Sequence, residues 1–364
     1  MSNQLDKNKV VIGMSGGVDS AVAAYVLKEQ GYDVIGITMK LWEEDESNYA
    51  EDYGGCCSLS SVEDARLVAE KLGIPFYVIN YKEDFMTSVV DNFIDEYLNG
   101  RTPSPCIRCN KYIKFDALLE TAKSLGAYYV ATGHYGIVTY DDQSQRHLIK
   151  KSKEERKDQT YMMYSLSQEQ IKHVLMPLGV YDTKEEVREI AEREDLIVAR
   201  KKDSQEICFV TDDDYARFVK EHTLKPIPKG NFVDTSGNIL GQHKGIIHYT
   251  IGQRKGLGMT FGKPMYVVAI HASTNEVVLG ENDDVFKKEF YAKEVNFISF
   301  ENLEDGYECT GKVRYSSKTS PCKLYKDGIN RIRVVFDQPQ RAVTPGQAVV
   351  FYDEDTLVGG GVIE

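Results

Sequence analysis

The sequence contains no run of 18 apolar residues, so we expect no membrane-spanning helix. Its first nine residues are polar and unlike a signal or transit peptide. Cysteine is scarce: seven residues, an odd number in a chain of 364, argue against a disulfide scaffold and favour a reducing cytoplasm. No internal repeat or low-complexity tract stands out. With 42% apolar and 27% charged residues, we expect a soluble, cytoplasmic globular protein of two or three domains.

The chain also lacks an excess of positive charge, since its net charge is −12. An acidic average does not exclude nucleic-acid binding, because such binding depends on a local basic face. Basic side chains cluster at Lys150–Lys157, Arg200–Lys202, Arg254–Lys255 and Lys312–Arg314. If the protein binds nucleic acid, these clusters should converge on one face, although Lys150–Lys157 taken alone is equally consistent with a solvated loop.

A glycine-rich turn, Gly13-Met14-Ser15-Gly16-Gly17-Val18-Asp19-Ser20, follows the first apolar run and precedes a helical pattern at 21–27. The glycines let a ligand approach the backbone, and the N–H groups at the helix start attract an anion such as phosphate. A Gly-Gly pair alone is more often an ordinary tight turn, and no Walker lysine follows this one. The complete string, however, resembles the PP-loop of the ATP pyrophosphatase superfamily, whose enzymes cleave ATP between the α- and β-phosphates.

Strand and helix patterns alternate through the first 150 residues. Further strands are predicted at 34–39, 76–79 and 128–132, helices at 62–72, 85–98 and 111–125, and a hairpin at 136–150. Short helices are expected at 168–175, 183–194 and 212–221, the second with a capping box at Thr183 and Glu186. The alternation predicts an α/β fold with a doubly wound parallel sheet, and ligand sites beyond the carboxyl ends of its strands, where the glycine turn lies.

Beyond Pro226 the composition shifts toward glycine and short β-type runs. These runs lie at 246–250, 265–271, 276–279, 308–314, 331–336 and 348–352. They predict small all-β, barrel-like modules. We therefore expect a catalytic domain at 1–222 with a helical extension from about residue 151, a small central β domain at 223–282, and a C-terminal β-barrel domain at 283–364.

The sequence places a C-x-x-C motif, Cys106 to Cys109, after the prolines at 103 and 105, in a loop expected before the helix at 111. A thiolate at Cys109 would be stabilised by the helix dipole and by neighbouring basic residues. Cys208 follows the basic run Arg200–Lys202. The alternatives are buried inert thiols or a structural zinc site that would use Cys56, Cys57, Cys106 and Cys109. Cys309 and Cys322 are expected to be packing residues.

Further motifs, together with the PP-loop and in this order, resemble those of the tRNA-specific 2-thiouridylases over nearly the whole chain. They are Thr102–Pro105 with Cys109–Phe115, Ala131–Tyr135, Lys157–Tyr161, Lys202–Ser204 with Ile207–Phe209, Tyr249–Arg254 and Thr344–Ala348. That family replaces the C2 oxygen of the anticodon wobble uridine with sulfur in tRNAs for Lys, Glu and Gln. The resemblance therefore implies an ATP-dependent tRNA sulfurtransferase.

The resemblance also implies site residues, a cofactor and partners. Cys208 would carry the incoming persulfide, Cys109 would be the partner thiol, and Asp19 would act through Mg²⁺ on the phosphates. ATP would be held by Gly13, Met14, Ser15, Gly16, Gly17, Val18, Asp19, Ser20, Met39 and Gly133. The flipped-out base would face Ser104, Pro105 and Cys106, and tRNA would contact His134, Lys157, Asp158, Gln159, Arg314, Tyr315 and Gln347. The sulfur would come from a persulfide donor or relay protein and ultimately from a cysteine desulfurase.

The sequence departs from the family pattern in two places. The family usually shows Asn-Pro-Asp where this chain has Ser104-Pro105-Cys106, so a third cysteine stands in place of an acid. The usual Asp-Ser-Thr-Gly-Ile-Cys is changed within Asp203–Cys208, which alters only that loop. As an alternative to the persulfide route, Cys106, Cys109 and Cys208 would form a three-thiolate site for a [4Fe–4S] cluster with one iron open to sulfide.

Two other functions are alternatives. A PP-loop ligase or amidotransferase acting on a small molecule would use the glycine turn, but it would have no use for two reactive thiols or the β modules. A zinc-stabilised tRNA-binding module without catalysis would leave the PP-loop unexplained. Formation of AMP rather than ADP from ATP when tRNA is added would separate these possibilities.

Overall fold

The computed structural model describes residues 5–42, 59–202, 207–210, 212 and 214–364. The chain divides into two compact units, each discontinuous in sequence. The first comprises Met1–Val89, Cys106–Asp213 and Asp355–Leu357, and the second comprises Val90–Pro105, Asp214–Glu354 and Val358–Glu364. Among the described residues, no helix combines the length and the apolar character needed to cross a membrane.

The described part of the first unit is built on a parallel sheet with strand order β3-β2-β1-β4-β7. Its strands are β1 (Asp6–Gly13), β2 (Asp33–Lys40), β3 (Phe76–Asn80), β4 (Ala127–Ala131) and β7 (Val174–Leu175). At the centre, Val11 of β1 pairs with Ile35 of β2 on one side and with Val130 of β4 on the other. The predicted parallel sheet is confirmed, and the carboxyl ends of β2, β1 and β4 lie side by side at one edge.

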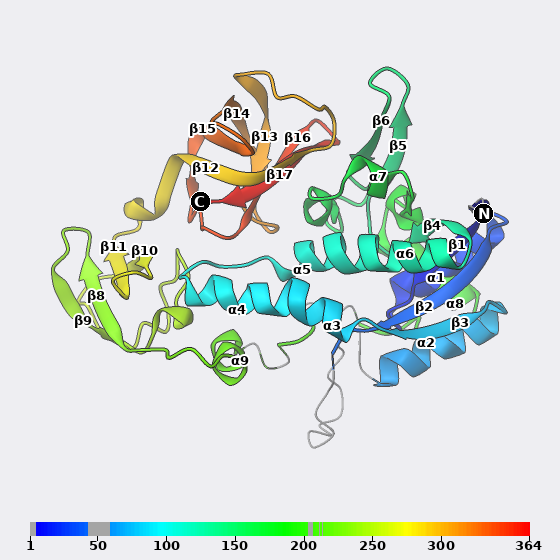
Figure 1. Cartoon of the computed structure of the whole chain (residues 1–364), viewed down its shortest axis with the longest axis horizontal. Helices are drawn as coiled ribbons and strands as arrows, with labels where there is room; N and C mark the ends of the chain where they lie inside the picture. Colours follow the sequence, from blue (N-terminus) through cyan, green and yellow to red (C-terminus); the bar gives the residue numbers. More distant parts are fainter. Residues whose placement is uncertain (1–4, 43–58, 203–206, 211, 213) are drawn as a thin grey trace. The chain divides into compact units, whose positions relative to one another are not determined.

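Helices flank this sheet (Figure 1). Helix α1 (Val18–Glu29) packs against both α2 (Leu59–Leu72) and α8 (Lys184–Arg193), and α6 (Leu118–Ser124) packs on β4 and β1. The remaining helical segments are α3 (Lys82–Phe85), η1 (Met86–Val90), α5 (Pro105–Arg108), η2 (Cys109–Ala117), η3 (Thr160–Met163), α7 (Gln168–Ile171) and η4 (Pro177–Val180). Strands β5 (Ile137–Asp141) and β6 (Arg146–Lys150) form the hairpin that the sequence predicts.

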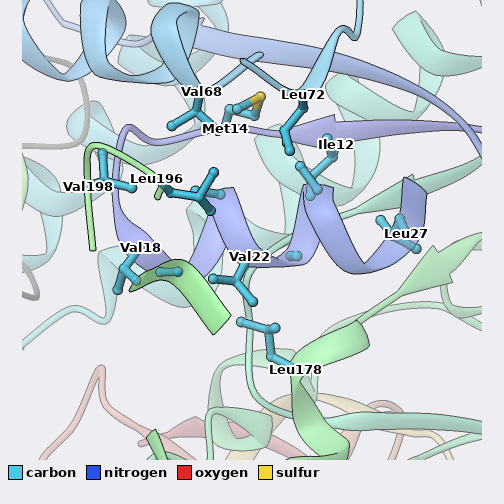
Figure 2. Close-up of a cluster of buried hydrophobic side chains, with 14 of the residues drawn as sticks. Ile12, Met14, Val18, Val22, Leu27, Val68, Leu72, Leu178, Leu196 and Val198 are labelled. Atoms are coloured by element: carbon cyan, nitrogen blue, oxygen red, sulfur yellow. The ribbon is translucent and has the colours of Figure 1, made fainter. Parts of the chain in front are cut away.

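Helix α1 is buried along most of its length, which fixes the position of its first turn. Figure 2 shows Val18, Val22 and Leu27 of α1 in one apolar cluster with Ile12 of β1 and Met14 of the glycine turn. The cluster also contains Val68, Leu72, Leu178, Leu196 and Val198. Each fully buried aliphatic side chain contributes about 1.5–3 kcal/mol to stability. The turn between β1 and α1 is therefore held rigidly at both ends.

The second unit contains two β modules. Before them, α4 (Asp91–Leu98) packs on α9 (Tyr215–His222), where the rings of Tyr97 and Tyr215 stack with centroids 4.8 Å apart. The first module is a mixed sheet with order β10-β11-β8-β9. It consists of β8 (Gly230–Asp234), β9 (Ile239–His243), β10 (Tyr266–His271) and β11 (Glu276–Gly280), with η5 (Ile246–His248) and η6 (Asp283–Val285) beside it.

The second β module is a closed barrel. Its strands are β12 (Phe286–Phe297), β13 (Tyr307–Lys312), β14 (Ser320–Lys326), β15 (Arg331–Arg341), β16 (Ala348–Asp353) and β17 (Thr356–Ile363). The strands follow the order β12-β15-β14-β13-β16-β17, and the pairing of Ala292 with Ile363 joins the first strand to the last. Phe290 and Phe336 stack in its interior with centroids 5.9 Å apart. The barrel-like architecture predicted from the β-type runs is confirmed.

Three local predictions are wrong. The C-x-x-C motif does not precede a helix but lies on one, because the helical segment begins at Pro105, and proline is well suited to a first helical turn. The helix predicted at 168–175 ends at Ile171, and Val174 instead pairs with Val130 as an edge strand. The strand predicted at 246–250 is the short 3₁₀ helix η5, which follows Gly245 with its positive φ of 126°.

Candidate active site

The glycine turn between β1 and α1 is shaped for close approach of a ligand. Gly16 has a φ of +68°, and a β-carbon there would collide with the carbonyl oxygen of Ser61, so only glycine fits. Ser20 closes the turn: its hydroxyl accepts from the N–H of Ser15 at 3.1 Å and donates to the carbonyl of Gly17 at 3.1 Å. No side chain among the described residues caps α1 at Gly17. The first N–H groups of α1 are therefore available to an anion.

The residues expected to hold ATP lie together. The side chain of Met39 reaches this turn, since a β-carbon built on Gly13 would lie 3.5 Å from the methyl group of Met39. Gly133, just after β4, lies against the first turn of α1, because a β-carbon there would come within 2.7 Å of the backbone nitrogen of Ser20. The ends of three neighbouring strands thus surround the start of α1, as a ligand site of an open parallel sheet requires.

Asp19, in the first turn of α1, is held by two partners from distant segments. The hydroxyl of Tyr135 donates to its Oδ1 at 2.8 Å, and the ammonium of Lys184 bonds the same oxygen. Tyr135 belonged to a motif of the sequence but had no predicted role, and Lys184 was not predicted at all. The sequence did contain a signal for the role of Lys184: it directly follows the N-cap Thr183, and a cation is unfavourable at a helix start unless an anion lies nearby.

The segment 157–159 lies beside this network rather than apart from it. The side-chain oxygen of Gln159 accepts from the N–H of Tyr135 at 3.0 Å, and the N–H of Gln159 donates to the carbonyl of Tyr135 at 3.0 Å. Asp158 accepts from the N–H of Ser152 at 3.1 Å. The N–H of Lys157, which is half-buried, donates to the carbonyl of Glu154 at 3.0 Å, so all three residues of this segment also make bonds within the protein.

His134 stands one residue before Tyr135. Its Nδ1 lies 2.7 Å from the hydroxyl of Thr132, and its ring lies 5.9 Å from that of Phe115. Desolvation, together with the positive charge of Lys114, lowers the pKa of His134 well below its ordinary value. The imidazole is therefore neutral at neutral pH and acts in hydrogen bonding rather than as a cation.

The two cysteines expected to transfer sulfur both belong to the first unit. Cys109 is buried where α5 passes into η2. Segment η2 is a π-helix, an irregularity often found at functional sites. Cys208 is half-buried, and its neighbour Phe209 packs edge-on to Phe85 with centroids 5.6 Å apart and against Trp42 at 6.2 Å. These rings anchor the chain immediately after Cys208.

The basic run before Cys208 is not uniform. The ammonium of Lys201 donates to the carbonyl of Gly16 at 3.0 Å, to the hydroxyl of Ser61 at 3.2 Å and to the carboxylate of Asp64 at 2.7 Å. Arg200 is different, because its side chain is 92% exposed. Lys201 therefore braces the glycine turn, and Arg200 faces solvent.

The described residues contain no group of three or more His, Cys, Asp or Glu side chains arranged to hold a metal ion. Cys106 is exposed whereas Cys109 is buried. In the described residues, Cys106, Cys109 and Cys208 are therefore not arranged as a three-thiolate site. Cys56 and Cys57, the other half of the zinc alternative, lie outside the described residues.

The remaining predicted residues belong to the second unit or its border. The amide of Gln347 donates to the carbonyls of Thr102 and Pro103 at 3.1 and 3.0 Å, just ahead of Ser104 and the buried Pro105. The guanidinium of Arg314 donates to the carbonyl of Ala342 at 2.7 Å. Tyr315 is 39% exposed, and the ammonium of Lys312 lies 5.6 Å from the centre of its ring.

Fold and glycine turn together define a PP-loop protein of the HUP class joined to two β modules. Residues 8–212 match the family model described as tRNA methyl transferase HUP domain. Residues 216–281 match the tRNA methyl transferase PRC-barrel domain, and residues 287–363 match the aminomethyltransferase β-barrel domain.

Curated relatives narrow the class to one family. The tRNA-specific 2-thiouridylase MnmA of Clostridioides difficile is 59% identical over 98% of both chains. The enzyme of the same name from Acetivibrio thermocellus is 57% identical over 99% of this chain and 100% of its own. A solved structure, NMN synthetase from Francisella tularensis, is 17% identical with a TM-score of 0.33, covering 55% of this chain and 67% of that chain, which is too distant to support an assignment. The chain belongs to the tRNA-specific 2-thiouridylase family.

Proposed function

We propose that this protein is a cytoplasmic tRNA-uridine 2-sulfurtransferase that thiolates the wobble uridine of tRNAs for Lys, Glu and Gln. The observation that carries the proposal is the start of α1 beside Asp19, where Gly17 provides no side-chain cap, in a chain 59% identical to a 2-thiouridylase over 98% of its length. Residues 1–222 would form the catalytic domain, with a tRNA-binding extension from about 151, followed by the β domains 223–282 and 283–364.

ATP fits the glycine turn. Its phosphates would accept hydrogen bonds from the backbone N–H groups at the start of α1, while Met39 and Gly133 would border the nucleotide. A resident Mg²⁺ would bind the phosphates and the carboxylate of Asp19, and when bound it supplies positive charge to the departing pyrophosphate. The C2 oxygen of the uridine attacks the α-phosphorus, and pyrophosphate leaves. This makes an otherwise unreactive ring oxygen a good leaving group.

Sulfur transfer then uses the two cysteines. The terminal sulfur of a persulfide on Cys208 attacks C2, loses its proton, and displaces AMP. The thiolate of Cys109 attacks the Sγ of Cys208, which breaks the bond to the transferred sulfur and leaves 2-thiouridine with a Cys109–Cys208 disulfide. A thiol reductant would reduce this disulfide to the two thiols, and a persulfide donor would then transfer its outer sulfur to Cys208.

The first test is the fate of ATP. With unmodified tRNA and Mg²⁺, we expect AMP and pyrophosphate to form in equal amounts, because a PP-loop site directs attack to the α-phosphorus. Thin-layer chromatography of ATP labelled at the α-phosphate would measure AMP and ADP directly. Removing Mg²⁺ with a chelator should stop the reaction.

Two controls separate the alternatives. A tRNA that already carries 2-thiouridine should yield no AMP, and neither should one with cytidine at the wobble position. Release of ADP would contradict the PP-loop assignment, and AMP formation without any tRNA would favour a ligase acting on a small molecule.

The second test concerns contacts with tRNA phosphates. Because Arg200 is exposed and Lys201 is bonded internally, Arg200→Met should reduce the salt slope of tRNA binding by about one and Lys201→Met should leave it unchanged. Filter binding at several salt concentrations measures the slope for each variant.

These adjacent variants are matched controls for each other, since each removes one positive charge. An equal change of slope in both would mean that net charge, rather than a phosphate contact at Arg200, governs binding. The convergence of all four basic clusters on one face stays a prediction.

A further inference from the structure

Lys184 is a buried cation in an unfavourable place. It is the first residue of α8, after the N-cap Thr183, whose hydroxyl accepts from the N–H of Glu186 at 3.2 Å. Only 7% of its side chain is exposed. The start of a helix carries partial positive charge, and a desolvated ammonium there is costly unless an anion compensates it. A lysine that served only to begin α8 would gain nothing from burial.

Among the described residues, Asp19 of the glycine turn supplies a compensating negative charge. Lys184 bonds Oδ1 of Asp19, and its ammonium also stands 5.7 Å from the ring centre of Tyr135. The hydroxyl of Tyr135 donates to the same Oδ1. The side chain of Asp19 is 30% exposed, so solvent or a ligand can reach this residue. Both bonds to Asp19 fall on one oxygen, and no described residue bonds Oδ2.

We propose that Lys184 is a positioning residue for the adenylation step, an inference that rests on the function proposed above. Lys184 and Tyr135 fix Oδ1 and so the rotation of the carboxylate, which leaves Oδ2 for the Mg²⁺ that accompanies ATP. The charge of Lys184 also offsets that of Asp19. The polyanionic phosphates of ATP then meet a neutral pair at the start of α1 instead of a lone carboxylate.

The direct test is Lys184→Met, with Lys71→Met as the matched control. Lys71 also pairs with an aspartate, since its ammonium lies 2.7 Å from the carboxylate of Asp195. Its side chain, however, is 38% exposed, and its partner is not part of the glycine turn. Binding of ATP without tRNA is measured by equilibrium dialysis at a series of Mg²⁺ concentrations, and thermal unfolding is followed on the same samples. This readout does not depend on turnover.

For Lys184→Met we expect the half-saturating Mg²⁺ concentration and the dissociation constant of Mg-ATP each to rise about tenfold. The unfolding midpoint should change little, because methionine fills a similar volume and Asp19 can be solvated. Lys71→Met should leave all three quantities unchanged. Tyr135→Phe, which keeps the ring and removes one donor to Oδ1, should raise the Mg²⁺ requirement about threefold.

A lower unfolding midpoint with unchanged Mg²⁺ and ATP binding in Lys184→Met would reduce Lys184 to a structural ion pair and overturn the proposal. If that variant does not fold, Tyr135→Phe decides in the same way, since it keeps the ring in place and removes one donor to Oδ1 of Asp19. Failure of the proposed function would look different: the wild-type protein itself would form no AMP with tRNA, whatever the variants bind.

Discussion

Asp19→Asn is expected to lower the rate of tRNA-dependent AMP formation by about 10²–10³-fold while the protein stays folded. The amide oxygen of asparagine still accepts from Tyr135 and Lys184, so the network around the turn is kept. The negative charge that would hold Mg²⁺ is lost, however, and it is needed most when pyrophosphate departs. Single-turnover measurement of AMP at saturating ATP and tRNA gives the effect on the chemical step.

Asp19→Ala is a poorer probe of the same step. It removes the shared acceptor of Tyr135 and Lys184, and loss of one partner of a buried pair costs about 3–5 kcal/mol. The loss of folding free energy in Asp19→Ala should lie at or below the lower end of this range, because 30% of the Asp19 side chain is exposed. We expect a midpoint lower by several degrees in thermal unfolding.

Asp33→Asn serves as the control for Asp19→Asn. Asp33 pairs with Lys9 at 3.7 Å on the surface of the same unit, and 60% of its side chain is exposed. Its replacement should change neither AMP formation nor stability. Full activity in Asp19→Asn would remove Asp19 from the mechanism.

Cys208→Ser and Cys109→Ser should each reduce 2-thiouridine formation below detection, because a hydroxyl neither carries a persulfide nor attacks one. Both variants should still form AMP within a few-fold of the wild-type rate, since neither cysteine belongs to the glycine turn. Mass spectrometry of digested tRNA measures thiolation, and labelled ATP measures adenylation. A mass increase of one sulfur on Cys208 after incubation with a persulfide donor would support its role directly.

Two further cysteine variants complete this experiment. Cys309→Ala removes a half-buried thiol of the barrel, 3.7 Å from the sulfur of Cys322, and should leave thiolation unchanged. Cys106→Asp restores the acid usual in the family and should also remain active on the persulfide route. Stoichiometric iron and sulfide in anaerobically purified protein, together with an inactive Cys106→Asp, would contradict that route. Loss of AMP formation in Cys208→Ser would instead make Cys208 structural.

The sheet and the glycine turn were predictable because their signals are local. The apolar run Val10–Ile12, the glycines, and the helical spacing that follows are all within about twenty residues, and the structure keeps them as β1, the turn and α1. The capping residue Thr183 was predictable for the same reason. The confirmed elements are those in which a short stretch of sequence contains both the apolar spacing of a helix or strand and the glycine or capping residue that ends it.

The contacts that the sequence did not reveal join residues that lie far apart along the chain. Lys184 and Asp19 are separated by 165 positions, and no spacing rule connects them. The hydrogen bonds of Lys201 to Gly16 and Asp64 are equally remote, and they convert one member of an apparent surface cluster into part of the turn. The strand at Val174 was misread because two residues carry no periodicity, so only its pairing with Val130 defines it.

The division of the chain also has a consequence for its synthesis on the ribosome. Residues 90–105 emerge early, yet they fold with the second unit, where the N–H of Thr102 donates to the carbonyl of Pro345 at 2.9 Å and Gln347 binds the next two carbonyls. Residues 355–357 belong in turn to the first unit. A nascent chain that ends before residue 345 therefore leaves the backbone of Thr102 and Pro103, just ahead of Cys106 and Cys109, without these bonds. Domains usually fold in order as they emerge, but the segment that leads into this C-x-x-C helix makes the last of its native contacts only when translation is nearly complete.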